Sequence, residues 1–209
     1  MILVKPSFKI LRASELPLEL IELAGRTCYK SEDKITDDSA KKFVESVTRR
    51  GHHSVIEHAV VTVKIICDRG VTHEIVRHRL ASYSQESTRY CNYKGGVTFV
   101  IPPWCDIPEG DYGFKSLNEW WDSTTQVWCI AMLDCERQYR LLLNQGWSPQ
   151  QARSVLPNST KTEIVITANV REWRHIFTLR CNPQMNEVMR PLHQEMKRLI
   201  PIIFDDIEY

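Results

Sequence analysis

The run of residues 59–67 is the feature that most constrains the fold of this chain. It reads Ala-Val-Val-Thr-Val-Lys-Ile-Ile-Cys, and most of its side chains are β-branched. Such side chains lose rotamer freedom in a helix and pack well on a pleated sheet. Because the run is also almost continuously apolar, it is typical of a strand that is at least partly buried on both faces. We therefore predict a central strand here, around which the rest of the chain packs.

Elsewhere the spacing of apolar residues predicts helices. They are expected at residues 14–25, 36–51, 71–79, 117–143 and 148–157 and in two segments between 170 and 199. The expected helix caps are Ser14, Thr36 and Ser148, and the expected helix ends are Gly25, Gly51 and Gly146. Further strands are expected at residues 2–11 and 160–170.

This order of elements favours an α+β fold. The strands are too few for a doubly wound sheet, so we expect a small antiparallel or mixed sheet flanked by helices. With 209 residues, 43% of them hydrophobic, the chain can bury one sizeable core. Since no Pro/Gly/Ser-rich tract or charge block divides it, we predict a single domain over residues 1–209.

The charge balance limits the partners that the chain can bind. It has 27 basic and 26 acidic side chains, so it has no global field for a nucleic acid or an anionic membrane, and any anion site must be local. Its seven cysteines show neither a CxxC pair nor a disulfide-rich spacing, as expected in a reducing compartment. The sequence shows neither the apolar core of a signal peptide nor a run long enough to span a bilayer, so a cytoplasmic location is expected.

Residues 77–89 are the best candidate for a local anion site. Arg77, Arg79 and Arg89 carry planar guanidinium groups, which match phosphate and carboxylate oxygens two at a time. The alternative is a solvated basic face of a helix. Binding is favoured because residues 80–84 are mostly small and hydroxylic, without the lysines and glutamates of an ordinary exposed face.

The same segment resembles a known family. Arg77-His78-Arg79, followed after seven residues by Ser87, is similar to the signature of the flavin-dependent thymidylate synthases. Residues 51–58, 152–157 and 169–180 resemble further stretches of that family in the same order. The resemblance extends from about residue 50 to about residue 190.

The resemblance implies an enzyme that converts dUMP to dTMP by reductive methylation. It implies a homotetramer with shared active sites, in which NADPH reduces bound FAD, methylenetetrahydrofolate supplies the carbon and the reduced flavin provides the hydride. In such an enzyme the cofactor performs the redox chemistry, and the protein supplies binding, alignment and electrostatics.

Residue roles also follow from the resemblance. Flavin contacts are implied for Ser54, Arg77, His78, Arg79, Gln85, Asn169, Val170, Arg171 and His175. Contacts with dUMP are implied for Glu74, Arg77, Gln85, Glu86, Ser87, Thr88, Arg89, Arg153 and Arg180. Arg180 resembles the arginine placed against the uracil, where a fixed cation favours the N3-deprotonated ring and makes C5 a better nucleophile. Ser87 is assigned to substrate binding because no adjacent general base is evident.

Two of these positions depart from the family pattern. Glu74 stands where several relatives carry glutamine, and its carboxylate would repel a phosphate unless Arg77 or His73 neutralises it. Gln85 stands where some relatives carry glutamate, so a polar role there would have to use the amide.

Structural alternatives remain open for several residues. Ser54 and Glu57 have the spacing of a helix capping box. Arg153 and Arg180 have the alternative role of charges at helix C-termini, and His175 that of an ordinary core or surface histidine.

Two other functions compete with the enzyme hypothesis. One is a nucleic-acid-binding module that uses Arg77, Arg79, Arg89, Tyr83 and Tyr90, which the near-zero net charge disfavours. The other is a metal-dependent hydrolase built on His52, His53, Glu57 and His58. Since these four lack an HExxH arrangement, we expect no metal ion.

Overall fold

Strands β3 (Val60–Asp68) and β7 (Lys161–Asn169) are the middle strands of a four-stranded sheet in the computed structural model, which describes residues 1–116 and 122–209. The strand order is β2-β3-β7-β4, with β2 (Ser7–Ala13) and β4 (Ala81–Gln85) at the edges. Along both middle strands, buried side chains alternate with partly buried ones, because successive side chains point to opposite faces. The predictions of a central strand at 59–67 and a second strand at 160–170 are confirmed.

The chain divides into two compact units. The first unit holds residues 1–7, 66–74 and 85–164. The second holds residues 8–65, 75–84 and 165–209. The predicted α+β fold class is confirmed, whereas the single domain stays a prediction.

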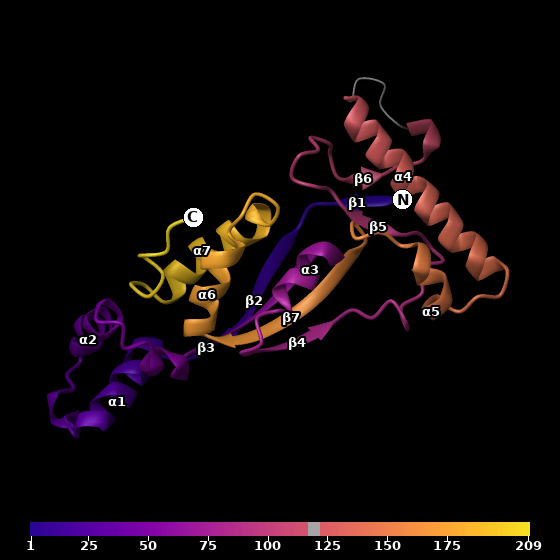
Figure 1. Cartoon of the computed structure of the whole chain (residues 1–209). Coiled ribbons are helices and arrows are strands. Elements are labelled where there is room, and N and C mark those ends of the chain that lie inside the picture. The colour runs from indigo at the N-terminus through magenta and orange to yellow at the C-terminus, as the bar shows by residue number, and fades with distance from the viewer. Residues whose placement is uncertain (117–121) are drawn as a thin grey trace. The chain divides into compact units, whose positions relative to one another are not determined.

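The first unit has its own small sheet. In it β1 (Ile2–Val4) pairs in parallel with β5 (Thr98–Val100) and antiparallel with β6 (Gly110–Asp111). Its helices are α3 (Arg69–Ile75, apart from its last residue), α4 (Ser123–Asn144), α5 (Pro149–Ala152) and the 3-10 turns η3 (Phe114–Ser116) and η4 (Arg153–Val155). Its core includes Leu3, Phe99, Met132, Leu133 and Tyr139, so α4 packs against the small sheet (Figure 1).

The second unit is mainly helical outside the strands. Its helices are α1 (Pro17–Tyr29), α2 (Ser39–Arg49), α6 (Val170–Arg180), α7 (Asn186–Leu199) and the 3-10 helices η1 (Glu32–Lys34) and η2 (His53–His58). Helices α1 and α2 lie side by side, as do α6 and α7 (Figure 1). The buried Trp173 ring stacks on Phe177 at 5.8 Å, and its indole N–H donates to the carbonyl of Val61. This contact fixes α6 against β3.

The N-terminal predictions are wrong in detail. The expected strand at 2–11 is two strands, separated at Pro6, which has no N–H to donate to a ladder. Ser14 does not cap a helix, because its hydroxyl accepts from the Val60 N–H at 2.9 Å. Helix α1 begins at Pro17 and continues through Gly25, where a Cβ atom would lie 2.5 Å from the Phe43 ring. Gly25 therefore permits close helix packing and does not end the helix.

Two more helix starts differ from the prediction. Helix α2 begins at Ser39, because the Ser39 hydroxyl accepts from the Thr36 N–H in a turn before the helix. Helix α4 begins at Ser123, where Asp122 accepts from the N–H groups of Thr124 and Thr125. The predicted start of that helix at 117 lies in residues 117–121, outside the described residues.

Several local predictions are confirmed. Gly51 follows the end of α2 with a φ of 76°, a conformation that glycine adopts without strain. Ser148 and Gln151 form the reciprocal capping box at the start of α5. The two helices expected between residues 170 and 199 are α6 and α7. Within the described residues no helix has both the length and the apolar character required to cross a bilayer.

Candidate active site

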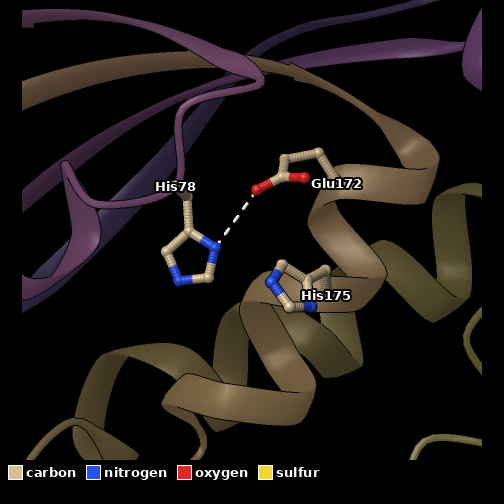
Figure 2. Close-up of side chains that lie close together, drawn as sticks. All are labelled: His78, Glu172 and His175. Atoms are coloured by element: carbon tan, nitrogen blue, oxygen red, sulfur yellow. Dashed lines mark hydrogen bonds and ion pairs between the residues drawn. The ribbon is translucent and has the colours of Figure 1, made fainter.

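His78 is the centre of a hydrogen-bonded chain in the second unit. Its Nδ1 lies 3.1 Å from Oε1 of Glu172, and its Nε2 accepts from Nε of Arg180, also at 3.1 Å. His78 and Glu172 are both buried, and the ring of His175 meets the His78 ring edge-on at 5.1 Å (Figure 2). The three partners of His78 all come from α6.

The contacts define the protonation of His78. A guanidinium is a donor only, so the Nε2 that accepts from Arg180 carries no proton. The ring proton is then on Nδ1 and donates to Glu172. Burial lowers the pKa of His78 below its ordinary value, although the hydrogen bond to Glu172 opposes this effect. His78 is therefore a neutral ring between a carboxylate and a cation.

The start of α6 gives these residues their positions. Asn169 caps the helix, since its side-chain oxygen accepts from the Glu172 N–H at 2.9 Å. The Val170 N–H donates to the carbonyl of Ala59, and the Val170 side chain is fully buried. Val170 thus anchors the helix start, and its predicted contact with flavin stays a prediction.

Most of the other residues assigned to flavin line hollows of the second unit. Ser54 and Arg171 line a pocket of ≈ 860 Å³. Asn169, Arg171 and His175 line a pocket of ≈ 550 Å³, and Asn169 also lines one of ≈ 440 Å³ with Arg79. Each volume falls in the range of about 300–1,000 Å³ that is usual for small-molecule sites. Each of these five predicted residues thus lines at least one hollow of a size that a small ligand can occupy.

Glu57 has a different partner from the predicted one. The expected capping box with Ser54 is absent, since η2 has no side-chain cap. The Glu57 carboxylate instead forms an ion pair with Arg171 at 2.5 Å. It therefore orients one of the predicted flavin residues.

Arg77 is not placed as the helix prediction required. Helix α3 ends at Ile75, and the Tyr83 hydroxyl lies 2.9 Å from the Ile75 carbonyl oxygen and 2.7 Å from that of His78. This hydroxyl therefore contacts the carbonyl of the last residue of α3 and that of His78, and Arg77, His78 and Arg79 follow the helix on a connecting segment. The prediction that Glu74, Arg77 and His78 share one helix face is wrong, and the ligand contacts of Glu74 and Arg77 stay predictions.

Four of the residues assigned to the nucleotide, Ser87, Thr88, Arg89 and Arg153, form a group in the first unit, whereas Arg77 and Arg180 belong to the second. Arg153 donates to the Thr88 hydroxyl at 3.3 Å, and Arg89 donates to the side-chain oxygen of Gln150 at 3.4 Å. The Ser87 hydroxyl accepts from the Arg89 N–H. Two exposed guanidinium groups and a hydroxyl therefore lie on one short loop and the adjoining helical turns, an arrangement suited to a phosphate.

Gln85 and Glu86 support this loop. The Gln85 amide donates to the hydroxyls of Thr72 and Thr162, which engages both of its N–H groups. The Glu86 carboxylate accepts from the Tyr93 hydroxyl at 2.6 Å and from Lys161 at 3.2 Å. Burial and this carboxylate raise the pKa of Tyr93. The side chains of both residues thus have partners within the protein, and their ligand contacts stay predictions.

The cluster around His78 resembles a metal site in composition only. Ligand atoms of His78, Glu172 and His175 lie within 4.8 Å of one another, and two histidines with a glutamate are a common zinc donor set. Here both His78 nitrogens are already engaged, and the Arg180 cation is adjacent. Across residues 1–116 and 122–209, the four side chains of the predicted metal alternative, His52, His53, Glu57 and His58, do not form such a group.

Three supporting residues were not predicted from the sequence. Glu172 looks like an ordinary acidic residue in the first turn of a helix, where the helix dipole favours a negative charge. Gln150 looks like part of a helix start, and Lys161 like the first residue of a strand. The partners that tie them to the site, His78, Arg89 and Glu86, are distant in sequence, so local patterns give no signal.

Comparisons with known proteins agree with this description. Residues 9–203 match the family described as Thymidylate synthase complementing protein. A flavin-dependent thymidylate synthase of Geobacter sulfurreducens is 37% identical over 91% of this chain and 82% of its own length. The enzyme of the same name from Mycobacterium tuberculosis is 35% identical over 90% of this chain and 79% of its own length.

Solved structures share the fold. A UMP/dUMP methylase PolB from Streptomyces cacaoi, bound with 5-Br dUMP, aligns with a TM-score of 0.79 at 23% identity and covers 98% of this chain and 96% of its own. Thymidylate synthase X from Helicobacter pylori, solved with FAD and dUMP, aligns with a TM-score of 0.73 at 24% identity, over 97% of this chain and 98% of its own.

Proposed function

This chain belongs to the thymidylate synthase complementing protein family, and we propose that it is a flavin-dependent thymidylate synthase that methylates dUMP to dTMP with FAD as cofactor. The observation that carries the proposal is the gathering of Ser54, Arg79, Asn169, Arg171 and His175 around the hollows of the second unit. These are residues that the family pattern assigns to flavin.

The residues present fit a flavin dinucleotide. Arg79 and Arg171 offer charge for a pyrophosphate, and Asn169 keeps its amide N–H groups after capping α6 through its oxygen. Bound FAD, once reduced, would supply the hydride that completes the new methyl group. The protein contributes the binding, the alignment and the exclusion of water.

The first-unit loop is the proposed site for the dUMP phosphate. Arg89 and Arg153 would neutralise the dianion, and Ser87 would donate its hydroxyl. In an active site that subunits share, Arg180 is the residue that we assign to the uracil. There its fixed charge would stabilise the N3-deprotonated ring and raise the nucleophilicity of C5.

The co-substrates, assembly and location extend this proposal. We assign NADPH as the reductant and methylenetetrahydrofolate as the carbon donor, in a cytoplasmic homotetramer with shared active sites. Leu20 and Leu23 of α1 are 37% and 49% exposed, and Leu16, just before the helix, is 69% exposed, which suits a subunit interface. All seven cysteines are free thiols, which suits a reducing compartment.

The direct test is a dTMP-forming assay with dUMP, methylenetetrahydrofolate and NADPH, with FAD present or withheld. We expect a yellow protein whose product formation requires flavin. Equal product without flavin would contradict the proposal. A protein that stays colourless but binds single-stranded oligonucleotides with a steep salt dependence would favour the nucleic-acid alternative, and activity lost to chelators would favour the metal alternative.

A further inference from the structure

We propose that Glu172 is a positioning residue for Arg180 and acts through His78. It holds the His78 proton on Nδ1, so that Nε2 presents a lone pair to the Arg180 guanidinium and fixes its orientation toward the substrate. This inference rests on the proposed function, since Arg180 is the residue assigned to the uracil.

The geometry makes His78 a connector between two ends of one helix. Glu172 lies in the first turn of α6 and Arg180 is its last residue, about 12 Å further along the axis at 1.5 Å per residue. The long Arg180 side chain reaches the imidazole, whose opposite edge meets the carboxylate at 3.1 Å. Each contact in the series is within hydrogen-bonding distance.

The tautomer depends on Glu172. A carboxylate is an acceptor only, so it selects the ring form with the proton on Nδ1. Without that acceptor, the ring can place its proton on Nε2, where it would face the N–H of Arg180. Two donors would then oppose each other, and the guanidinium would have to move.

Burial argues that this arrangement is specific. The side chains of His78 and Glu172 are only 2% and 6% exposed. They are therefore not a surface pair of the kind that contributes little to stability. A buried carboxylate is costly unless it is hydrogen-bonded, and Glu172 has His78 as its partner. The titratable and charged groups that act on His78 are Glu172, Arg180 and His175.

Glu172→Leu and Glu172→Gln separate the two properties of this residue. Leucine removes the acceptor, whereas the glutamine oxygen can still accept from Nδ1 while the negative charge is lost. We expect Glu172→Leu to lower kcat, measured per bound flavin, by about tenfold or more, with KM for dUMP little changed. The kcat of Glu172→Gln should stay within about threefold of that of the parent protein. Glu136→Gln, which changes a buried carboxylate of the first unit that accepts from the Val97 N–H and pairs with the Met1 ammonium group, is the matched control and should keep full turnover.

The pH profile distinguishes positioning from general damage. If Arg180 is misplaced, the deficit of Glu172→Leu should shrink as pH rises, because N3 of dUMP then loses its proton without help. A merely structural loss would lower the rate by the same factor at every pH, and that outcome would overturn the proposal.

A second measurement needs no substrate. Nitrogen-15 NMR of the ring nitrogens, with His78 assigned through His78→Gln, should show the Nδ1–H tautomer in the parent protein and in Glu172→Gln, and a shift toward Nε2–H in Glu172→Leu. An Nε2–H ring in the parent protein would overturn the proposal even if Glu172→Leu does not fold. So would tight Zn²⁺ binding that is lost with His78. If the parent protein makes no dTMP, the proposed function fails, while the tautomer result still tests the geometry.

Discussion

The two candidate binding regions hold their arginines in different ways. In the second unit, Arg180 donates to the buried His78, which is bound in turn by Glu172. In the first unit, Arg89 and Arg153 are exposed, and their hydrogen bonds of 3.4 and 3.3 Å go to neutral partners. A cation that stabilises charge developing during a reaction must be fixed beforehand, whereas one that neutralises a phosphate can adjust to it. The contrast suggests that catalysis depends on the first arrangement and affinity on the second.

Arg180→Ala should produce the largest effect. We expect turnover to fall by about 10²–10³-fold with flavin still bound, because loss of one preorganised electrostatic group costs this much. The measurement is dTMP formed per bound flavin. Arg198→Ala, at an exposed residue near the end of α7, is the control. Loss of flavin with normal turnover per remaining cofactor would assign Arg180 to the cofactor and break the comparison.

Arg153→Ala should act on affinity. Loss of a charged contact costs about 1.5–3 kcal/mol, so KM for dUMP should rise by roughly 10–100-fold while kcat changes little. Steady-state kinetics at varied dUMP concentration measures both constants. A fall in kcat with unchanged KM would mean that the first-unit arginine also acts in the reaction step.

Gly25→Ala tests whether the hollow of ≈ 860 Å³ in the second unit has rigid walls. The new methyl group would lie 2.5 Å from the Phe43 ring, which also lines that hollow. Overpacking of this kind costs about 1–3 kcal/mol, so the melting temperature should fall by several degrees and flavin affinity should decrease. Gly95→Ala, where a Cβ meets open space, is the matched control. Equal melting temperatures would show that Phe43 moves aside freely.

Acid should destabilise the second unit by a smaller amount. Burial lowers the pKa of both His78 and His193, so the unfolded chain binds protons more readily than the native one. Their stabilisation is complete above the ordinary histidine pKa of about 6.5 and is lost as pH falls through the lower native values. His193→Gln keeps a donor for the Phe204 carbonyl and should reduce the loss of melting temperature between about pH 7 and 5. If the variant loses as much melting temperature between these pH values as the parent protein, His193 does not contribute to the acid sensitivity.

The sequence predicted the elements whose causes are local. The β-branched run of β3, the capping box at Ser148 and the apolar stripes of α6 and α7 were all visible as patterns. The errors have causes that are distant in sequence. The Ser14 hydroxyl accepts from the Val60 N–H, which is 46 positions away in the sequence. Helix α3 ends at Ile75, whose carbonyl accepts from the Tyr83 hydroxyl, and residues 71–79 alone could not show this contact.

The residues of the candidate site likewise divide into those that the sequence could identify and those that depend on distant partners. A motif could identify His78 and Arg180 through a resemblance, and the structure brings them into contact. Glu172 was not predicted, because an acid in a first helical turn is common and its partner is 94 positions earlier. The engagement of Gln85 and Glu86 within the protein likewise depends on residues of other strands and turns.

The placement of Glu172 and Arg180 on one helix has a consequence for how the gene can vary. Each residue turns an α-helix by about 100°, so a single-codon insertion or deletion between the two would swing one of them to another side of α6. A single substitution between them leaves their relative orientation unchanged, whereas a change in the number of residues does not. The spacing of eight positions should therefore resist insertion and deletion more strongly than the loops before and after α6.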